Sequence, residues 1–199
     1  PANASRFDVF LSTYGEANLE FNKTDIATDA LGVEDIEIVD LNDDGRLDLI
    51  STWTDAGVVA VHLNRGGNPT QFETKTFPQG GRPVGLALGD INGDGIIDFV
   101  NANNLTEIYY YLNDGEENFE QHKVSLEYVL DPVSFLPIAG SIANAPRDVC
   151  VADFDLDGDM DIFVSGDGGS SLLESDLAFR PEPVMDEPPP PPYPLWYGW

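Results

Sequence analysis

The sequence predicts an all-β protein built from four-stranded antiparallel blades of the β-propeller type. Two observations carry this prediction. A nine-residue acidic segment occurs three times, at residues 40–48, 90–98 and 153–161, and each copy lies between two segments with the alternating or apolar pattern of strands. The copies start 50 and then 63 residues apart, which indicates a repeated supersecondary unit. We therefore expect about three blade equivalents in the chain.

Each acidic segment is predicted to join two strands, and two more strands follow in the first two repeats. The strands before the acidic segments are expected at residues 35–39, 84–88 and 147–152, and those after them at 47–50, 97–100 and 160–164. The first repeat continues with strands at 58–64 and 72–77, and the second with strands at 108–113 and 119–124. A polar turn containing glycine separates the last two strands. Four short antiparallel strands make up one propeller blade.

The two ends of the chain predict only parts of a blade. Residues 7–12 and 19–26 have the pattern of the last two strands of a unit, whereas the third repeat offers its first two strands and a weak third at 170–174. Two strands from each end would make one composite blade. Closed propellers need about four blades or more, so three leave an open arc whose edge strands need a partner or a cover. The predicted units are an N-terminal half-blade at 1–33, a first blade at 34–80, a second blade with a connecting segment at 81–146, a partial third blade at 147–180 and a proline-rich aromatic tail at 181–199.

The acidic segments have the composition and spacing of calcium-binding loops. Calcium takes about six to eight oxygen ligands, and side chains at positions 1, 3, 5 and 9, with the carbonyl of position 7, can converge on one ion. Glycine at position 6 allows the sharp reversal of the chain. The candidate ligands are Asp40, Asn42, Asp44, Arg46 and Asp48 in the first loop, Asp90, Asn92, Asp94, Ile96 and Asp98 in the second, and Asp153, Asp155, Asp157, Asp159 and Asp161 in the third, with Arg46, Ile96 and Asp159 contributing carbonyls.

These loops differ from the helix-flanked EF-hand. An EF-hand closes with glutamate at position 12, where this chain has Ser51, Asn101 and Val164. A metal-free turn rich in Asp, Asn and Gly is the alternative for any single copy, but three copies with aspartate at position 9 favour Ca²⁺ at three sites. Magnesium prefers fewer protein carboxylates and more waters. The third loop has the most carboxylates, so we expect it to bind calcium most tightly.

The repeats resemble the FG-GAP/VCBS repeat family of calcium-loop β-propellers, which is related to the blades of integrin α-chain head domains. The resemblance rests on an apolar strand, the loop Asp-x-Asn/Asp-x-Asp-Gly-x-x-Asp, a second apolar strand, and then Leu-Asn-x-Gly and Phe. It covers about residues 34–175. It implies a propeller fold with calcium in the loops, and it is compatible with a lectin-like or adhesion module.

Charge and composition exclude several classes of partner. The chain has 36 acidic and 9 basic residues, a formal charge of −27, which disfavours binding to nucleic acids and to anionic membrane surfaces. Twelve of its 23 aspartates lie in the three loops. No apolar segment approaches the roughly 20 residues that cross a bilayer, so we expect no membrane insertion. Three calcium ions would add six charges and bring −27 to −21.

The sequence offers little for catalysis, so we expect no enzyme. The two histidines, His62 and His122, lie in strand-like segments and are expected on sheet surfaces. No nucleophile elbow, phosphate-binding glycine loop or histidine-based zinc spacing occurs. The single cysteine, Cys150, excludes an intrachain disulfide and is expected to be a small buried hydrophobe.

An extracellular or cell-surface location is predicted. Asn3, Asn22 and Asn104 fit the N-glycosylation acceptor pattern, and the chain begins at Pro1, as a processed or trimmed protein would. The tail is expected to form a polyproline II segment that ends in aromatic anchors. It would dock on a neighbouring subunit or fold back over an open blade edge. Its candidate interface residues are Pro188, Pro189, Pro190, Pro191, Pro192, Tyr193, Trp196, Tyr197 and Trp199.

The predicted function is that of a secreted, calcium-stabilised structural protein that associates head to tail. The half-blade at the start of one chain would complete the half-blade at the end of the next by strand pairing, with the tail as a second contact. Such contacts close into an oligomer, for example a six-blade dimer, or propagate as a filament. One alternative is a lectin-like or adhesion module that binds a glycan or cell-surface ligand through Trp53 and Tyr109–Tyr111. Another is that the chain is one fragment of a longer protein that contains the remaining blades.

Overall fold

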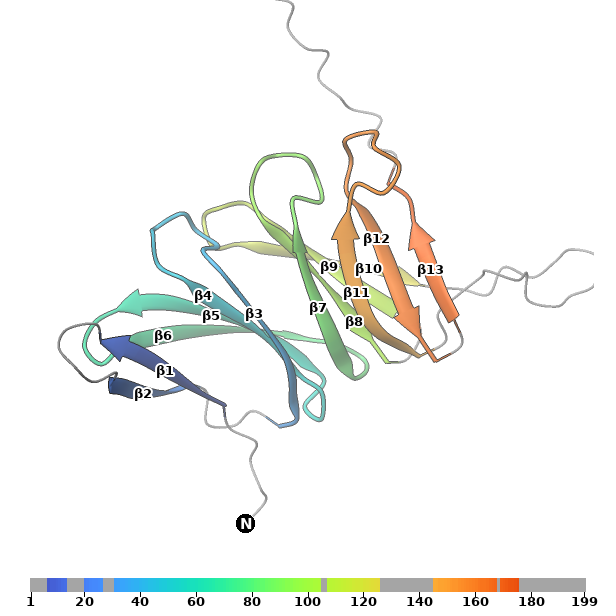
Figure 1. Ribbon diagram of the computed structural model, residues 1–199. Helices are drawn as coiled ribbons and strands as arrows, with labels where there is room; N and C mark the ends of the chain where they lie inside the picture. Colours follow the sequence, from blue (N-terminus) through green and yellow to red (C-terminus); the bar gives the residue numbers. More distant parts are fainter. Residues whose placement is uncertain are drawn as a thin grey trace, which may run out of the picture.

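The computed structural model of the chain is a row of antiparallel β-sheets (Figure 1). The structure describes residues 7–13, 20–26, 31–104, 107–125, 145–167 and 169–175. These residues contain strands and no helix, and two of their sheets have four strands in sequential order. The predicted all-β fold of propeller-like blades is therefore confirmed. No helix in this part of the chain is long and apolar enough to cross a membrane.

The described residues form four sheets that follow one another in chain order, and in each of them the strands pair with their sequence neighbours. The N-terminal hairpin contains β1 (Phe7–Thr13) and β2 (Glu20–Ile26); the first sheet contains β3 (Val33–Val39), β4 (Asp48–Trp53), β5 (Val58–Gly66) and β6 (Gln71–Pro78); the second contains β7 (Pro83–Gly89), β8 (Asp98–Asn103), β9 (Glu107–Asn113) and β10 (Phe119–Ser125); and the third contains β11 (Pro146–Ala152), β12 (Asp161–Gly166) and β13 (Gly169–Leu173). Each acidic loop joins the first two strands of its sheet.

The third sheet has three strands, one more than the two that a composite blade would take from the C-terminal part of the chain. β13 pairs with β12 over five residues, from Ile162 opposite Leu173 to Gly166 opposite Gly169. The weak third strand expected near residues 170–174 therefore forms. A blade shared between the two ends would therefore not consist of two strands from each, because the third sheet has three strands and the N-terminal hairpin has two.

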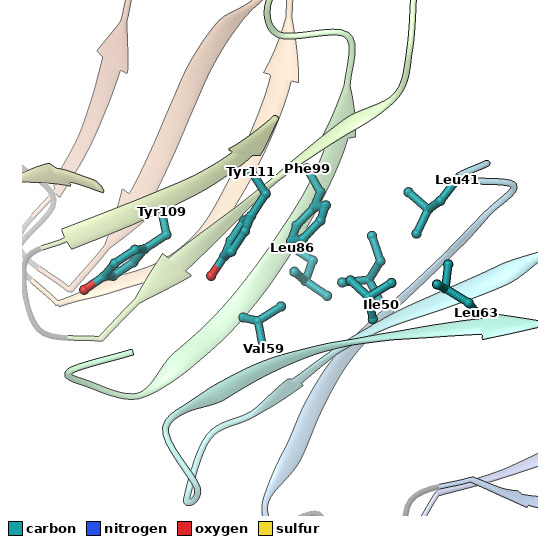
Figure 2. Packing of buried hydrophobic residues seen from close by; sticks show 9 residues of the cluster. Leu41, Ile50, Val59, Leu63, Leu86, Phe99, Tyr109 and Tyr111 are labelled. Atoms are coloured by element: carbon teal, nitrogen blue, oxygen red, sulfur yellow. The ribbon is translucent and has the colours of Figure 1, made fainter. Parts of the chain in front are cut away.

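An apolar core lies between the first and second sheets (Figure 2). Alternate residues of β5, among them Val59 and Val61, point toward the second sheet because successive side chains of a strand lie on opposite faces. The second sheet contributes Phe99 and Tyr111, whose rings stack with centroids 4.3 Å apart. Tyr109 belongs to the same buried cluster.

A second core lies between the second and third sheets and uses the opposite face of β8. Val100 and Ala102 alternate with Phe99 along this strand, and they pack with Val149 and Val164 of the third sheet. The second sheet is therefore buried on both faces. Its position between two neighbours explains why β8 is buried along its whole length.

The first strands of the first, second and third sheets carry an irregularity at similar places. The register of β3 against β4 shifts between Val33 and Ile36, and the first strands of the second and third sheets shift at the corresponding residues. At the first irregularity the carboxylate of Asp35 accepts the backbone N–H of Leu86 in the next sheet at 2.8 Å. Bulges bend a strand and redirect side chains, and here the bulge links adjacent sheets.

Two predictions about single residues were wrong. His62 is completely buried, not on a sheet surface. Its ring nitrogens hydrogen-bond with Ser51 Oγ and Thr74 Oγ1, each at 2.9 Å, and its ring stacks on Trp53 at 6.0 Å. Burial lowers the pKa of His62 to about 4. Conversely, Cys150 is exposed, because it lies on the face of β11 opposite to Val149, which faces the second sheet.

The aromatic set proposed for ligand binding is also mainly in the core. Trp53, Tyr109 and Tyr111 are buried. The indole N–H of Trp53 donates to Ser51 Oγ at 2.8 Å, and the hydroxyl of Tyr111 accepts from the Gln79 side chain. Tyr110 is half-buried and packs beside the core of the second and third sheets. These aromatic residues therefore pack the sheets and do not gather on one exposed loop face.

Candidate metal centres

The three acidic loops have the same backbone conformation at the position where the chain reverses. Gly45, Gly95 and Gly158 occupy position 6 with φ of 80°, 86° and 99°. Residues with a Cβ are disfavoured in this left-handed region. Glycine at position 6 thus folds each loop back so that its acidic side chains turn toward their own backbone.

The aspartate at position 1 of each loop caps the turn. Both oxygens of Asp40 accept backbone N–H groups, from Asp44 at 3.2 Å and from Gly45 at 2.8 Å. Asp90 accepts the N–H groups of positions 5 and 6 in the second loop at 3.0 and 2.8 Å, and Asp153 does so in the third at 3.1 and 3.0 Å. In all three loops the position 5 aspartate accepts the N–H of position 7. The backbone thus holds these carboxylates inside the loop before any cation binds.

The aspartate at position 9 joins its loop to the third strand of its sheet. Asp48 is fully buried and accepts the N–H groups of Leu41 at 3.0 Å and of Asn64 at 2.7 Å. Asp98 accepts those of Ile91 and Asn113, at 2.9 and 2.8 Å.

Asp161 repeats this arrangement in the third sheet. It accepts the N–H groups of Phe154 and Ser175, at 2.9 and 2.8 Å. Burial raises the pKa of Asp48 and Asp98 above the ordinary value for aspartate. A buried carboxylate of this kind favours a cation beside it, since a nearby positive charge stabilises the ionised form.

The third loop brings three carboxylates closest together. Single oxygens of Asp153, Asp155 and Asp161 all lie within 4.8 Å of one another. In the part of the chain that the structure describes, this is the one group of three or more acidic, histidine or cysteine side chains with such spacing. Positions 1, 3 and 9 of the predicted ligand set are therefore brought together in this loop.

The first loop offers an amide oxygen that has no hydrogen-bond partner. Asn42 Oδ1 is buried and, within the described residues, accepts no hydrogen bond. Its amide group donates to Glu117 Oε1 at 3.0 Å. A buried acceptor without a partner costs free energy, and a calcium ion would satisfy it, because amide oxygens are calcium ligands. The all-oxygen donor sets of the loops fit this cation.

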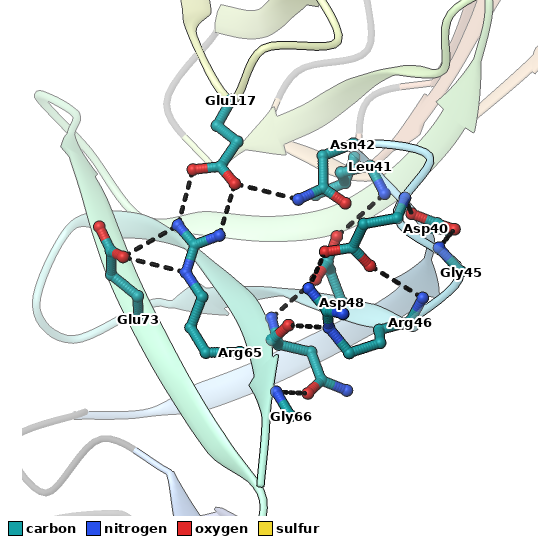
Figure 3. Close-up of polar contacts among 12 residues, drawn as sticks. Asp40, Leu41, Asn42, Gly45, Arg46, Asp48, Arg65, Gly66, Glu73 and Glu117 are labelled. Atoms are coloured by element: carbon teal, nitrogen blue, oxygen red, sulfur yellow. Dashed lines mark hydrogen bonds and ion pairs between the residues drawn. The ribbon is translucent and has the colours of Figure 1, made fainter.

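Glu117 of the second sheet and two cations of the first sheet, Arg65 and Lys75, complete the surroundings of the first loop. Figure 3 shows the carboxylate of Glu117 between Asn42 and the guanidinium of Arg65, which donates to Glu117 Oε2 at 2.6 Å. Lys75 Nζ donates to the backbone carbonyl of Glu117 at 2.7 Å. The hydrogen bonds from Arg65 hold the pKa of Glu117 at about 2. The sequence pattern did not reveal Glu117, because it lies 75 residues from Asn42 in the chain.

The predicted ligands at positions 5 and 7 have additional contacts. The side chain of Arg46, predicted to contribute only its carbonyl, forms an ion pair with Asp44, and its Nε donates to the Asn64 carbonyl at 2.7 Å. In the second loop, Asn92 donates to Asp94 Oδ2 at 2.9 Å. A cation in the first loop would therefore share Asp44 with a guanidinium, which would place the first loop at a disadvantage relative to the third.

Several predicted sites lie wholly or partly outside the described residues. The tail residues 188–193, 196, 197 and 199 do, and so does Asn3. Asn22 lies in β2, and only its backbone is described. Asn104 follows β8, and its backbone N–H donates to the Arg82 carbonyl at 2.9 Å. Glycosylation and tail docking remain predictions.

Comparison with known sequence families identifies the repeats. The sequence model of the FG-GAP-like repeat matches residues 40–101 and again residues 90–164. The two matches together span residues 40–164, which are 125 of the 199 residues and include all three acidic loops. No curated protein matches the chain.

Proposed function

The chain belongs to the FG-GAP-like repeat family, and on this basis we propose that it is a calcium-stabilised structural module that assembles with copies of itself outside the cell. The family consists of structural and binding modules and is typical of extracellular and surface proteins. Calcium, secretion and self-assembly are the proposed parts of this function.

The observation that carries the calcium proposal is the threefold repetition of one hydrogen-bond network. In the first and second sheets the position 9 aspartate ties the loop to the third strand, and in the third sheet it ties the loop to Ser175, just after the third strand. The position 1 aspartate holds the turn in all three. Two like charges 4.8 Å apart, the spacing limit in the third loop, repel by roughly 3 kcal/mol at an effective dielectric constant of about 20. A divalent cation would turn this repulsion into attraction at the point where loop and sheet meet.

Charge and topology support the proposal of self-assembly. Among the described residues, the first sheet in chain order is a two-stranded hairpin and the last has three strands, whereas the two sheets between them have four strands. The two outer sheets of the described residues therefore have fewer strands than the sheets between them, and strand pairing with a second copy would complete them. Calcium at three sites would reduce the charge of each copy from −27 to −21, and it would weaken repulsion between copies. The proline-rich tail is a second proposed contact.

The calcium proposal is tested by thermal unfolding. The unfolding midpoint is measured in excess calcium, in excess magnesium and after chelation. Binding to the folded state raises stability by about 2.7 kcal/mol per site when the free ion is at 100 times its dissociation constant. We expect a clear rise with calcium and a smaller one with magnesium. An unfolding midpoint that is the same in calcium and in chelator contradicts the proposal.

A further inference from the structure

The contact between neighbouring sheets occurs twice in the chain and uses equivalent positions both times. Leu41, at position 2 of the first loop, is buried in the core shared with the second sheet. Ile91, at position 2 of the second loop, packs against the core shared with the third sheet. The same equivalence holds on the second strands, where Ile50 and Val100 each face the following sheet.

The equivalent positions of the third sheet have no following sheet within the described residues. Phe154 is 46% exposed and Leu172 is 40% exposed. Phe154 has the position of Leu41 and Ile91, and Leu172 pairs with Phe163 as Val61 pairs with Ile50. Cys150, which has the position of Ala87, is also exposed. We call Cys150, Phe154, Phe163 and Leu172 the C-terminal open face.

Within the described residues, the first sheet has exposed apolar side chains on its other side. Ile36, Ile38 and Leu47 are 39%, 56% and 60% exposed. In the second sheet the residues equivalent to Ile36 and Ile38 are Leu86 and Leu88, and both pack against the first sheet. We call Ile36, Ile38 and Leu47 the N-terminal open face.

We propose that the C-terminal open face of one copy packs on the N-terminal open face of a second copy and continues the row of sheets. This inference rests on the self-assembly in the proposed function and names the surfaces that carry it. A second copy is the occupant because the two faces are the two halves of a contact that the chain already makes twice. The halves are different surfaces, so the association is head to tail.

The N-terminal hairpin leaves room for this contact. Ile26 of β2 is buried, and Lys23 and Thr24 line the same pocket as Phe72 and Thr74 of β6. The hairpin thus lies beside the outermost strand of the first sheet, while the exposed Ile36 and Ile38 belong to β3 at the other edge. The third sheet of a second copy would cover the part of the first sheet that the hairpin leaves open.

A side-chain hydrogen bond between the first and second sheets would have a counterpart in the proposed contact. Asn113 Nδ2 donates to the Leu41 carbonyl of the preceding sheet at 2.7 Å and to the Ile97 carbonyl at 3.1 Å. Asn64 has the equivalent position in the first sheet, and within the described residues its Nδ2 donates only to the Leu47 carbonyl, at 3.1 Å. Its second N–H group would reach the Phe154 carbonyl of the second copy, as Asn113 reaches Leu41.

Two variants that each block one face test the proposal. Ile38→Asp places a charge on the N-terminal open face, and Leu172→Asp places one on the C-terminal open face. Both residues are exposed in the single chain, so the variants should fold. Leu156→Asp is the matched control, because Leu156 is 86% exposed and the equivalent position of the first loop is already an aspartate, Asp43.

Sedimentation velocity of the full chain in calcium measures association. We expect the wild type and the Leu156→Asp control to form oligomers and each blocking variant to remain a monomer. An equimolar mixture of the two blocking variants should form a dimer, because each retains the face that the other lacks. A monomeric wild type, blocking variants that associate like the wild type, or a mixture that stays monomeric would each overturn the proposal.

A calcium titration of the same samples separates this inference from the proposed function. If the wild type binds calcium but fails to associate, the open faces do not form the contact, while calcium stabilisation stands. If the wild type binds no calcium, the proposed calcium role fails. In that case, the sedimentation of the blocking variants and the wild type in calcium-free buffer still shows whether the two open faces form the contact.

Discussion

Asn42 in the first acidic loop donates a hydrogen bond to Glu117 of the second sheet at 3.0 Å. The bond crosses the boundary between two blades and leaves Asn42 Oδ1, a candidate calcium ligand, buried without a hydrogen-bond partner in the described part of the chain. Arg65 holds Glu117 from the other side at 2.6 Å. The orientation of a candidate ligand in one blade therefore depends on a carboxylate in the next.

Replacing Glu117 tests this dependence. Glu117→Ala removes the acceptor for the Asn42 amide, and loss of a residue that orients a metal ligand typically lowers metal affinity by about 10-fold to 100-fold. Calorimetric calcium titration should show one weakened site and two unchanged ones. Glu116→Ala is the control, because Glu116 is an exposed neighbour with no contact to Asn42. Unchanged affinity at all sites in Glu117→Ala would rule out the orienting role.

The position 9 aspartates should be needed for the fold as well as for the ion. Both oxygens of the buried Asp98 accept backbone N–H groups, one from the partly buried Ile91 and one from the buried Asn113. In Asp98→Asn the amide group would face one of these donors, so we expect a loss of about 1–3 kcal/mol in unfolding free energy even after chelation. Asp94→Asn is the matched control, since Asp94 lies at the exposed position 5. Chemical denaturation in chelator measures the unfolding free energy of both variants. An equal loss of stability in Asp98→Asn and Asp94→Asn would contradict the structural role of position 9.

The third loop should bind calcium more tightly than the others because of its extra carboxylate. Asp155→Asn gives position 3 the residue that the first and second loops already have, Asn42 and Asn92. We expect the tightest calcium site to weaken and become similar to the others, with little change in the stability of the calcium-free protein. The reciprocal change, Asn92→Asp, should strengthen the second site. A calcium titration in which Asp155→Asn leaves the tightest site unaffected contradicts this ranking.

His62 should make the protein less stable in mild acid. Its pKa is lowered by burial from 6.5 to about 4, so the unfolded chain takes up a proton between these values and the folded chain does not. The stabilising contribution of neutral His62 is complete above pH 6.5 and is lost as the pH falls toward 4, by up to about 1.4 kcal/mol per pH unit.

The comparison with His62→Gln isolates this effect from the titration of carboxylates. Unfolding free energies of both proteins are measured by denaturation across this pH range at saturating calcium. The wild type should lose stability more steeply than the variant as pH decreases. Parallel pH profiles would show that His62 does not titrate as its burial implies.

The sequence was sufficient for the strands and for the loops between them. Alternating apolar residues and glycine at position 6 are local signals, and they predicted strands such as β4 and the reversal at Gly45. β13 gave a weak signal because Gly169, Ser170 and Ser171 have low strand propensity. It forms because its backbone pairs with β12, which local propensity does not reveal.

Contacts between sheets account for what the sequence did not reveal. His62 and Cys150 were assigned the wrong exposure because alternation gives two faces of a strand but does not say which neighbour covers each face. The second acceptor bond of Asp48 reaches Asn64, 16 residues away, and Glu117 reaches across sheets. The recurring Leu-Asn at residues 63–64 and 112–113 was the one local sign of such a partner.

Native mass spectrometry of the intact chain, in calcium and after chelation, measures directly whether the three repeated loops are three calcium sites. Three repetitions of one hydrogen-bond network predict a mass increase equal to three calcium ions per chain, and Asp155→Asn should lose its last ion at a higher free calcium concentration than the wild type does. A chain that retains no calcium in this measurement would contradict the proposal that the loops are metal centres.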